Sequence, residues 1–196
     1  MAKEMILRAT AEAVAADPLL GFSMQEVARR ANVSLRSLYR YFPTRRQLFE
    51  ALYDWSASNA NVAGIVETLE GLEDLPASVH ELFARFESDK AVVRAGVMSS
   101  ISLGAQPERQ REWDSVVAKL FHESTPELGE DEARQAFAVV RLLFSGRVWL
   151  SLTERFGLDT QAAADAVEWA SSTLIADLNA RGGRAAETPV RGGEDK

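Results

Sequence analysis

A short arginine-rich segment carries side chains that can bind a nucleic acid. Arg36, Ser37 and Arg40 lie within two turns of a helix expected over residues 34–42. An arginine can donate two parallel hydrogen bonds to a guanine edge, a hydroxyl can bond a base or a phosphate, and Leu35 can contact a thymine methyl group. Because a helix of this kind fits the major groove of B-DNA, we interpret the segment as a base-reading helix.

The residues at the end of that helix have types that favour phosphate contacts. Tyr39, Tyr41 and Thr44 carry hydroxyls, and Arg45 and Arg46 add cations beside the first amides of the next helix, which also attract phosphate. The candidate DNA contacts are therefore Leu35, Arg36, Ser37, Tyr39, Arg40, Tyr41, Thr44, Arg45 and Arg46.

Successive N-cap residues divide this region into short helices. Ser23 followed by Glu26 predicts a capping box at the start of the first helix, and Phe22 with Val27 predicts a hydrophobic staple there. We therefore expect this helix to begin sharply at Ser23.

A tight turn separates the first two of these helices. Asn32 can adopt the left-handed conformation that ends a helix, and Ser34 can cap the next one. Pro43 ends that helix, Thr44 caps a third, and Gln47 completes another capping-box pattern. Together these features predict a helix-turn-helix; the alternative is three packed helices with a solvated basic face.

An earlier helix can cover this motif. Its expected apolar stripe is Met5, Ile6, Ala9 and Ala13. Four-residue spacing turns Leu38 and Phe42 of the base-reading helix toward the same core. A compact three-helix head follows, and Leu48, Leu52 and Trp55 continue the helix that leaves it.

At these residues the chain resembles the TetR family of transcriptional regulators, with the arrangement VAxxAxVSxxxLYRYFxxxxxL over residues 27–48. Tyr41 replaces the commoner His of the family, Asn32 its commoner Gly, and Arg46 a frequent acid. Asn still tolerates a left-handed turn, and Tyr keeps a hydroxyl for a backbone contact.

The resemblance implies an all-α fold in two parts. Residues 1–46 would be the helix-turn-helix DNA-binding domain and residues 47–181 a helical ligand-binding and dimerisation domain. Residues 182–196 lack an apolar period and are rich in Gly and charge, so we expect them to form a disordered tail. The resemblance also implies a homodimeric repressor that binds a palindromic double-stranded operator and is released by a small, largely apolar effector.

Charge and composition agree with a DNA-binding head on an acidic body. The chain has a formal charge of −7, but residues 1–50 carry eight Lys or Arg and five Asp or Glu, which leaves +3 there and −10 in the remainder. Cysteine is absent, and neither a membrane span nor the apolar core of a signal peptide is visible, so we expect a cytoplasmic protein.

The rest of the chain shows helical periodicity, with large aromatic side chains on several stripes. Ordinary core packing is one role for each of them, and lining a cavity for an apolar ligand is the other. The candidate ligand-binding residues are Trp55, Phe83, Phe86, Trp113, Phe121, Phe137, Phe144 and Trp149.

Two long final helices are expected over residues 130–155 and 159–181, antiparallel across a turn at Gly157. Trp169 and Leu150 lie off their main apolar stripes, which indicates a second buried face and agrees with a dimer built from these two helices. The alternative is a monomer whose own earlier helices cover both faces.

Enzyme signatures are missing. His80 and His122 are the only histidines, neither has a second His one turn away, and no Gly-x-Ser-x-Gly elbow or phosphate-binding glycine loop occurs. We expect neither a cofactor nor a metal site. The competing functions are a helical small-molecule-binding or protein-interaction module, and an activator that lacks ligand-induced release.

Overall fold

The computed structural model describes residues 2–16, 23–61, 64–65, 67–103, 108–125 and 128–186, and these ranges contain helices and no β-strand. Side chains at 102–113, 116 and 182–186 lie outside the description. The all-α prediction is confirmed. No single helix in the described ranges is long and apolar enough to cross a membrane, although one bent pair of helices passes by length and composition.

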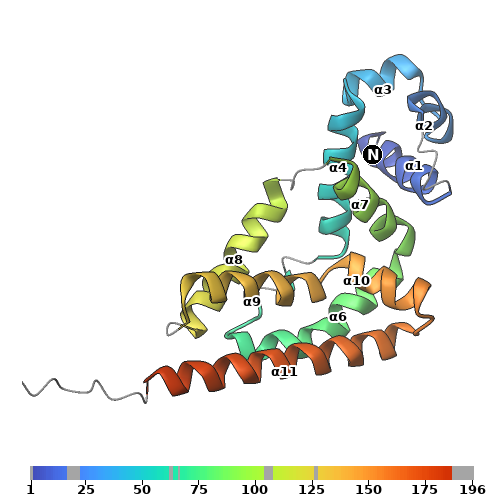
Figure 1. The fold of residues 1–196 in the computed structure, drawn as a ribbon. Helices are drawn as coiled ribbons and strands as arrows, with labels where there is room; N and C mark the ends of the chain where they lie inside the picture. The colour runs from blue at the N-terminus through green and yellow to red at the C-terminus, as the bar shows by residue number, and fades with distance from the viewer. Residues whose placement is uncertain are drawn as a thin grey trace, which may run out of the picture.

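The head consists of α1 (Ala2–Ala16), α2 (Met24–Arg30) and α3 (Leu35–Tyr41), which lie together at one end of the molecule (Figure 1). Ile6, Ala9 and Ala13 of α1 are buried as expected. Met5 is 47% exposed, so its assignment to the buried stripe is wrong. Leu38 and Phe42 are 0% and 2% exposed and complete the core of the head.

Two helices join the head to the body. α4 (Arg45–Asn59) leaves the head and runs into the body, and α7 (Lys90–Leu103) packs along both α4 and α1 (Figure 1). The head core contains Leu48 and Leu52 from α4 together with Val92 and Ala95 from α7. The two parts of the protein therefore share these helices rather than meeting through a linker.

The body is built from the remaining helices. A short 3₁₀ turn, η1 (Leu72–Asp74), precedes α6 (Leu75–Ser88), where Pro76 stands in the first turn as predicted. α8 (Glu108–Ser124) and α9 (Glu130–Leu143) follow α7. The chain ends its described part with α10 (Gly146–Leu150), a π-helical turn η2 (Ser151–Arg155) and α11 (Thr160–Ala186).

The predicted continuous helix over residues 130–155 is wrong. The chain breaks after Leu143, and the pair Glu130–Leu143 and Gly146–Arg155 is bent by 50°. Ser145 has extended backbone angles and accepts a hydrogen bond from the Val148 amide at 3.3 Å, so it caps a new helix. Gly146 lets α7 approach this corner closely, because a Cβ there would lie 3.0 Å from Val93 Cγ1.

The last helix also differs from expectation. α11 continues past Arg181 to Ala186, since a helix already formed can extend through Gly182 and Gly183 at a cost of about 1 kcal/mol each. Its main partner is α6, with a smaller contact to α9, so the expected pairing of the two final helices is secondary. Residues 187–196 lie outside the described ranges.

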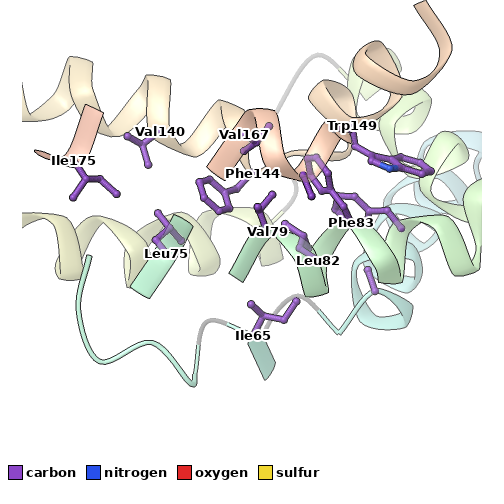
Figure 2. Packing of buried hydrophobic residues seen from close by; sticks show 14 of the residues in the cluster. Ile65, Leu75, Val79, Leu82, Phe83, Val140, Phe144, Trp149, Val167 and Ile175 are labelled. Atoms are coloured by element: carbon purple, nitrogen blue, oxygen red, sulfur yellow. The ribbon is translucent and has the colours of Figure 1, made fainter. Parts of the chain in front are cut away.

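The body has its own apolar core. Figure 2 shows Val79 of α6, Phe144 from the corner after α9, and Val167 of α11 gathered in one cluster. Phe83 and Trp149 are each fully buried in it. This cluster holds α6 and α11 together on the side of the molecule away from α3 (Figure 1).

Candidate DNA-reading surface and internal cavity

Local hydrogen bonds hold the head in shape. Ser23 caps α2 by accepting a bond from the Glu26 amide at 3.0 Å, but the Glu26 carboxylate binds Arg29 and Arg30, so the predicted capping box is only half formed. Phe22, the expected staple residue, lies outside the described ranges.

The turn between α2 and α3 is a Schellman motif. Asn32 has a φ of 52°, as predicted for a left-handed C-terminal residue. The Val33 amide donates to the Ala28 carbonyl at 3.0 Å, and the Asn32 amide donates to the Arg29 carbonyl at 3.2 Å. These two bonds fix the direction in which α3 leaves.

Side-chain caps begin the two helices that follow. Ser34 Oγ accepts from the Ser37 amide at 3.0 Å and donates to Ser37 Oγ at 2.9 Å. Thr44 Oγ1 accepts from the Gln47 amide at 3.1 Å, and its hydroxyl donates to Gln47 Oε1 at 3.3 Å. The Gln47 side chain therefore pairs with the Thr44 hydroxyl rather than with its backbone amide.

The predicted contact residues lie on α3 and at the start of α4. Leu35 and Ser37 are half-buried, and the other seven are exposed: Arg36, Tyr39, Arg40, Tyr41, Thr44, Arg45 and Arg46. All nine candidates thus lie on and just after α3, but Leu35 packs against the head core beside Leu38 rather than on the outer surface.

Several cations of the head already have partners. Arg29 and Arg30 bind Glu26, and these two guanidinium groups lower the pKa of the Glu26 carboxyl to about 2. Arg46 binds Glu50 at 2.9 Å in an exposed pair that can open at small cost to meet a phosphate. Arg45 lies with its guanidinium carbon 5.3 Å from the centre of the Phe49 ring.

A cavity of about 410 Å³ lies in the body, beside the helices that reach the head. Its walls come from α4, α7, α9 and the corner that leads into α10, and α6 and α8 add one residue each. The residues used below are Tyr53, Ser56 and Ala57 of α4, Gly96 and Val97 of α7, Asp114 of α8, and Arg141 of α9.

The cavity has one polar end. Arg141 donates through Nε to Asp114 Oδ1 at 2.6 Å, and both side chains are largely buried. Burial raises the pKa of the Tyr53 phenol to about 12, with the nearby charges of Arg141 and Asp114 opposing each other. The polar end is therefore a neutral phenol beside an internally neutralised ion pair.

The predicted aromatic set divides between cavity and core. Phe86, Phe137 and Phe144 line the cavity. Phe83, Phe121 and Trp149 are buried in the body core, and Trp55 packs against the head with the Arg8 guanidinium 5.4 Å from its ring centre. For these four residues the structure supports ordinary packing. The Trp113 side chain lies outside the description.

Most of the cavity lining was absent from the predicted set, and three of the absent residues show why. Tyr53 follows Leu52 in a helix whose apolar stripe was assigned to the head, and Gly96 has no side chain to suggest a role. Asp114 was not considered, because its partner Arg141 is 27 residues away in the sequence. The one indication in the sequence was an acidic residue within the apolar stripe of the helix expected there.

Comparisons with known proteins agree with this arrangement. A family model described as "Bacterial regulatory proteins, tetR family" matches residues 6–52. The HTH-type transcriptional regulator EthR of Mycobacterium tuberculosis is 31% identical over 105 residues, which cover 48% of this chain and 46% of EthR. The chain thus spans about half the length of the curated relatives it matches.

Solved structures with similar folds extend over most of the chain. A TetR-like transcriptional regulator from Rhodococcus sp. RHA1 has a TM-score of 0.65 at 16% identity, covering 89% of this chain and 96% of that protein. The multidrug binding protein EbrR, solved with imidazole, has a TM-score of 0.56 at 18% identity, covering 100% and 99%. The head of the chain, over residues 6–52, thus matches the tetR family of bacterial regulatory proteins, and its overall fold is similar to that of solved TetR-like regulators.

Proposed function

We propose that this protein is a cytoplasmic, non-enzymatic transcriptional repressor that binds a palindromic DNA operator as a homodimer and leaves it when a small, largely apolar ligand fills the cavity. The observation that carries the proposal is the sharing of α4 and α7 between the head core and the cavity wall. Any change in the cavity acts directly on helices that position α3.

The contact surface of α3 supports DNA reading. Arg36 and Arg40 are exposed where a helix in the major groove meets base edges, and Ser37 keeps a hydroxyl near them. Tyr39, Tyr41, Thr44 and Arg45 would hold the phosphates on either side. We expect base discrimination from Arg36 and Arg40, and sequence-independent affinity from the phosphate contacts.

One exposed tryptophan supports dimerisation through the last helices. Trp169 on α11 is 73% exposed, which is unusual for so large an apolar side chain, and Val139 on α9 is 51% exposed. Leu150, the other residue behind the dimer prediction, is only 8% exposed because the chain's own core covers it. The dimer proposal therefore rests on Trp169 and its surroundings.

A dimer would place two copies of α3 on one face of the duplex. Two half-sites one helical turn apart need recognition helices about 34 Å apart. A ligand that binds more tightly to a conformation in which the two α3 helices have another spacing would favour that conformation. DNA affinity would fall by at most the ratio of the ligand's affinities for the two conformations. Because Tyr53 and Ala57 of α4 line the cavity, a ligand would contact the helix that starts at the DNA surface.

The lining indicates the kind of ligand. Phe86, Phe137 and Phe144 offer an apolar body site, and the Tyr53 phenol with the Arg141–Asp114 pair offers hydrogen-bonding partners at one end. A mainly apolar molecule with one polar group fits this lining best. A molecule without a polar group would leave these buried groups without a new partner.

Fluorescence anisotropy with the DNA flanking the protein's own coding region tests the DNA-binding step. We expect saturable binding to a palindromic site that weakens steeply with salt. Absence of any preference over random duplex would favour the helical small-molecule-binding or protein-interaction module instead.

The release step needs a separate measurement. Apolar compounds that raise the melting temperature should lower affinity for the operator, and an Ala57→Phe variant, which fills the cavity from α4, should mimic them. Equal DNA affinity with every tightly bound compound would contradict release and leave an activator or a constitutive binder.

A further inference from the structure

Away from the DNA surface and the cavity, three side chains from two helices converge at one point. His80 lies on α6, and Asp165 and Glu168 lie on α11. His80 Nε2 is 2.8 Å from Glu168 Oε2 and 3.8 Å from Asp165 Oδ1, and one donor atom from each residue lies within 4.8 Å of the others. This cluster could not be predicted from the sequence because His80 and Glu168 are 88 residues apart.

The packing of α6 against α11 brings these groups together. Ala163 and Ala164 of α11 are 0% and 1% exposed, and such small side chains let the two helices approach closely. Val79, next to His80, is fully buried in the same core. Asp165 and Glu168 are three residues apart, so they project from one edge of α11 beside His80.

A second contact fixes the register between the helices. Thr160 at the start of α11 donates its hydroxyl to Glu87 Oε2 of α6 at 2.8 Å. The three-residue cluster is thus held by the packing of α6 against α11 and by this hydrogen bond near the start of α11. The three side chains already lie together in the folded chain without a metal ion.

The donor set matches a divalent metal ion. We propose that His80, Asp165 and Glu168 bind one first-row transition-metal ion of the Zn²⁺ type. An imidazole nitrogen with two carboxylate oxygens suits such an ion, whereas Mg²⁺ and Ca²⁺ prefer all-oxygen sites. The His80 side chain is 32% exposed and the carboxylates more so, which leaves room for water to complete the coordination.

Charge supports the same assignment. Two carboxylates face one imidazole, and among the described residues the ion pairs of Asp165 and Glu168 are with His80 alone. A dication placed between the three donors would cancel this excess of negative charge.

Gln161 acts as the outer partner of the cluster. Its side-chain amide lies 3.3 Å from His80 Nδ1 and 3.0 Å from Asp165 Oδ1. A metal-bound histidine is normally oriented by a hydrogen bond at its other ring nitrogen. Gln161 can supply that bond after a rotation of its amide, with its oxygen accepting from Nδ1–H.

Calorimetric titration of chelator-treated, tag-free protein with ZnCl₂ tests the proposal, which does not depend on DNA binding. We expect one ion per chain, no effect of MgCl₂, and a visible absorption band when CoCl₂ is used. His80→Ala should abolish binding. His122→Ala is the matched control, since His122 is the only other histidine and is exposed on α8.

A second variant guards against misfolding of the first. Glu168→Gln keeps a hydrogen-bonding group beside His80 but removes a charged ligand, and it should weaken Zn²⁺ binding while the circular dichroism melt remains cooperative. Saturable binding of equal strength in wild type, His80→Ala and Glu168→Gln would overturn the proposal, as would no saturable binding in the wild type.

Discussion

Gly96 of α7 packs directly against Ser56 of α4, so closely that a Cβ at position 96 would lie 2.9 Å from Ser56 Cβ. Ser56 is buried, and its hydroxyl donates to the Tyr53 carbonyl at 2.8 Å. Both residues line the cavity, so this contact joins α7 to α4, the helix that begins at the DNA surface, at the wall of the ligand site.

Replacing Gly96 by Ala should therefore separate α7 from α4. Overpacking costs about 1–3 kcal/mol, which exceeds the roughly 1 kcal/mol that alanine gains over glycine in a helix. Chemical denaturation should show a net loss of stability. Ile101→Ala on the same helix, at an exposed position, should stay within about 0.5 kcal/mol of wild type. Equal stability of Gly96→Ala and wild type would contradict the tight contact.

Arg45→Ala should weaken binding to all DNA sequences alike. A lost phosphate contact removes about one counterion released by each subunit, so the slope of log affinity against log salt should flatten by roughly one unit per subunit. Anisotropy titrations over a salt series measure this. Arg134→Ala, an exposed arginine on α9 paired with Asp131, should leave the slope unchanged. A changed base preference would instead assign Arg45 to base reading.

Arg36→Ala should change sequence preference rather than general affinity. If Arg36 makes two hydrogen bonds to one base, its loss should relax discrimination at that base position by about 1–3 kcal/mol. Selection of bound duplexes from a random library would show the affected position in both half-sites. An unchanged selected sequence would remove Arg36 from the base contacts.

Acid should expose the role of Glu26. Its folded pKa of about 2 lies below the ordinary value of 4.5, because Arg29 and Arg30 favour the carboxylate. The stabilisation is therefore complete above pH 4.5 and is lost as the pH falls toward 2. The difference in melting temperature between wild type and Glu26→Gln should shrink across this range. A difference that stays constant from pH 6 to about 2 would contradict the pairing.

Trp169→Ala should weaken self-association and leave the fold intact. The side chain is exposed in the single chain, whereas a tryptophan buried at the centre of an interface commonly contributes about 2 kcal/mol or more. Sedimentation velocity should show a shift from dimer to monomer. Ile101→Ser, another exposed apolar position, serves as the comparison. A dimer of unchanged strength would place the interface elsewhere.

The head was largely predictable because its shape depends on neighbours in sequence. Ser23, Ser34 and Thr44 cap helices through amides three residues away, and Asn32 turns the chain through its own backbone. The Glu26 carboxylate nevertheless binds Arg29 and Arg30 instead of its predicted backbone partner, because the two arginines and the backbone amide compete for the same oxygens.

The body was less predictable because its decisive contacts are distant in sequence. The apolar period runs on through Phe144 and Val148, which concealed the helix start at Ser145. Among eight aromatic candidates, the sequence could not distinguish Phe137, which lines the cavity, from Phe121, which packs edge-on against it with ring centres 6.2 Å apart. The His80 cluster likewise depends on the register of two helices.

Val92 and Ala95 of α7 belong to the core that surrounds α1 and α3. A fragment ending at residue 46 would lose these two residues together with Leu48 and Leu52, leaving an open apolar surface on its remaining helices. We therefore expect that the DNA-reading head does not fold on its own. Heat should unfold head and body in one cooperative transition, and a compound bound only in the body should delay the melting of both.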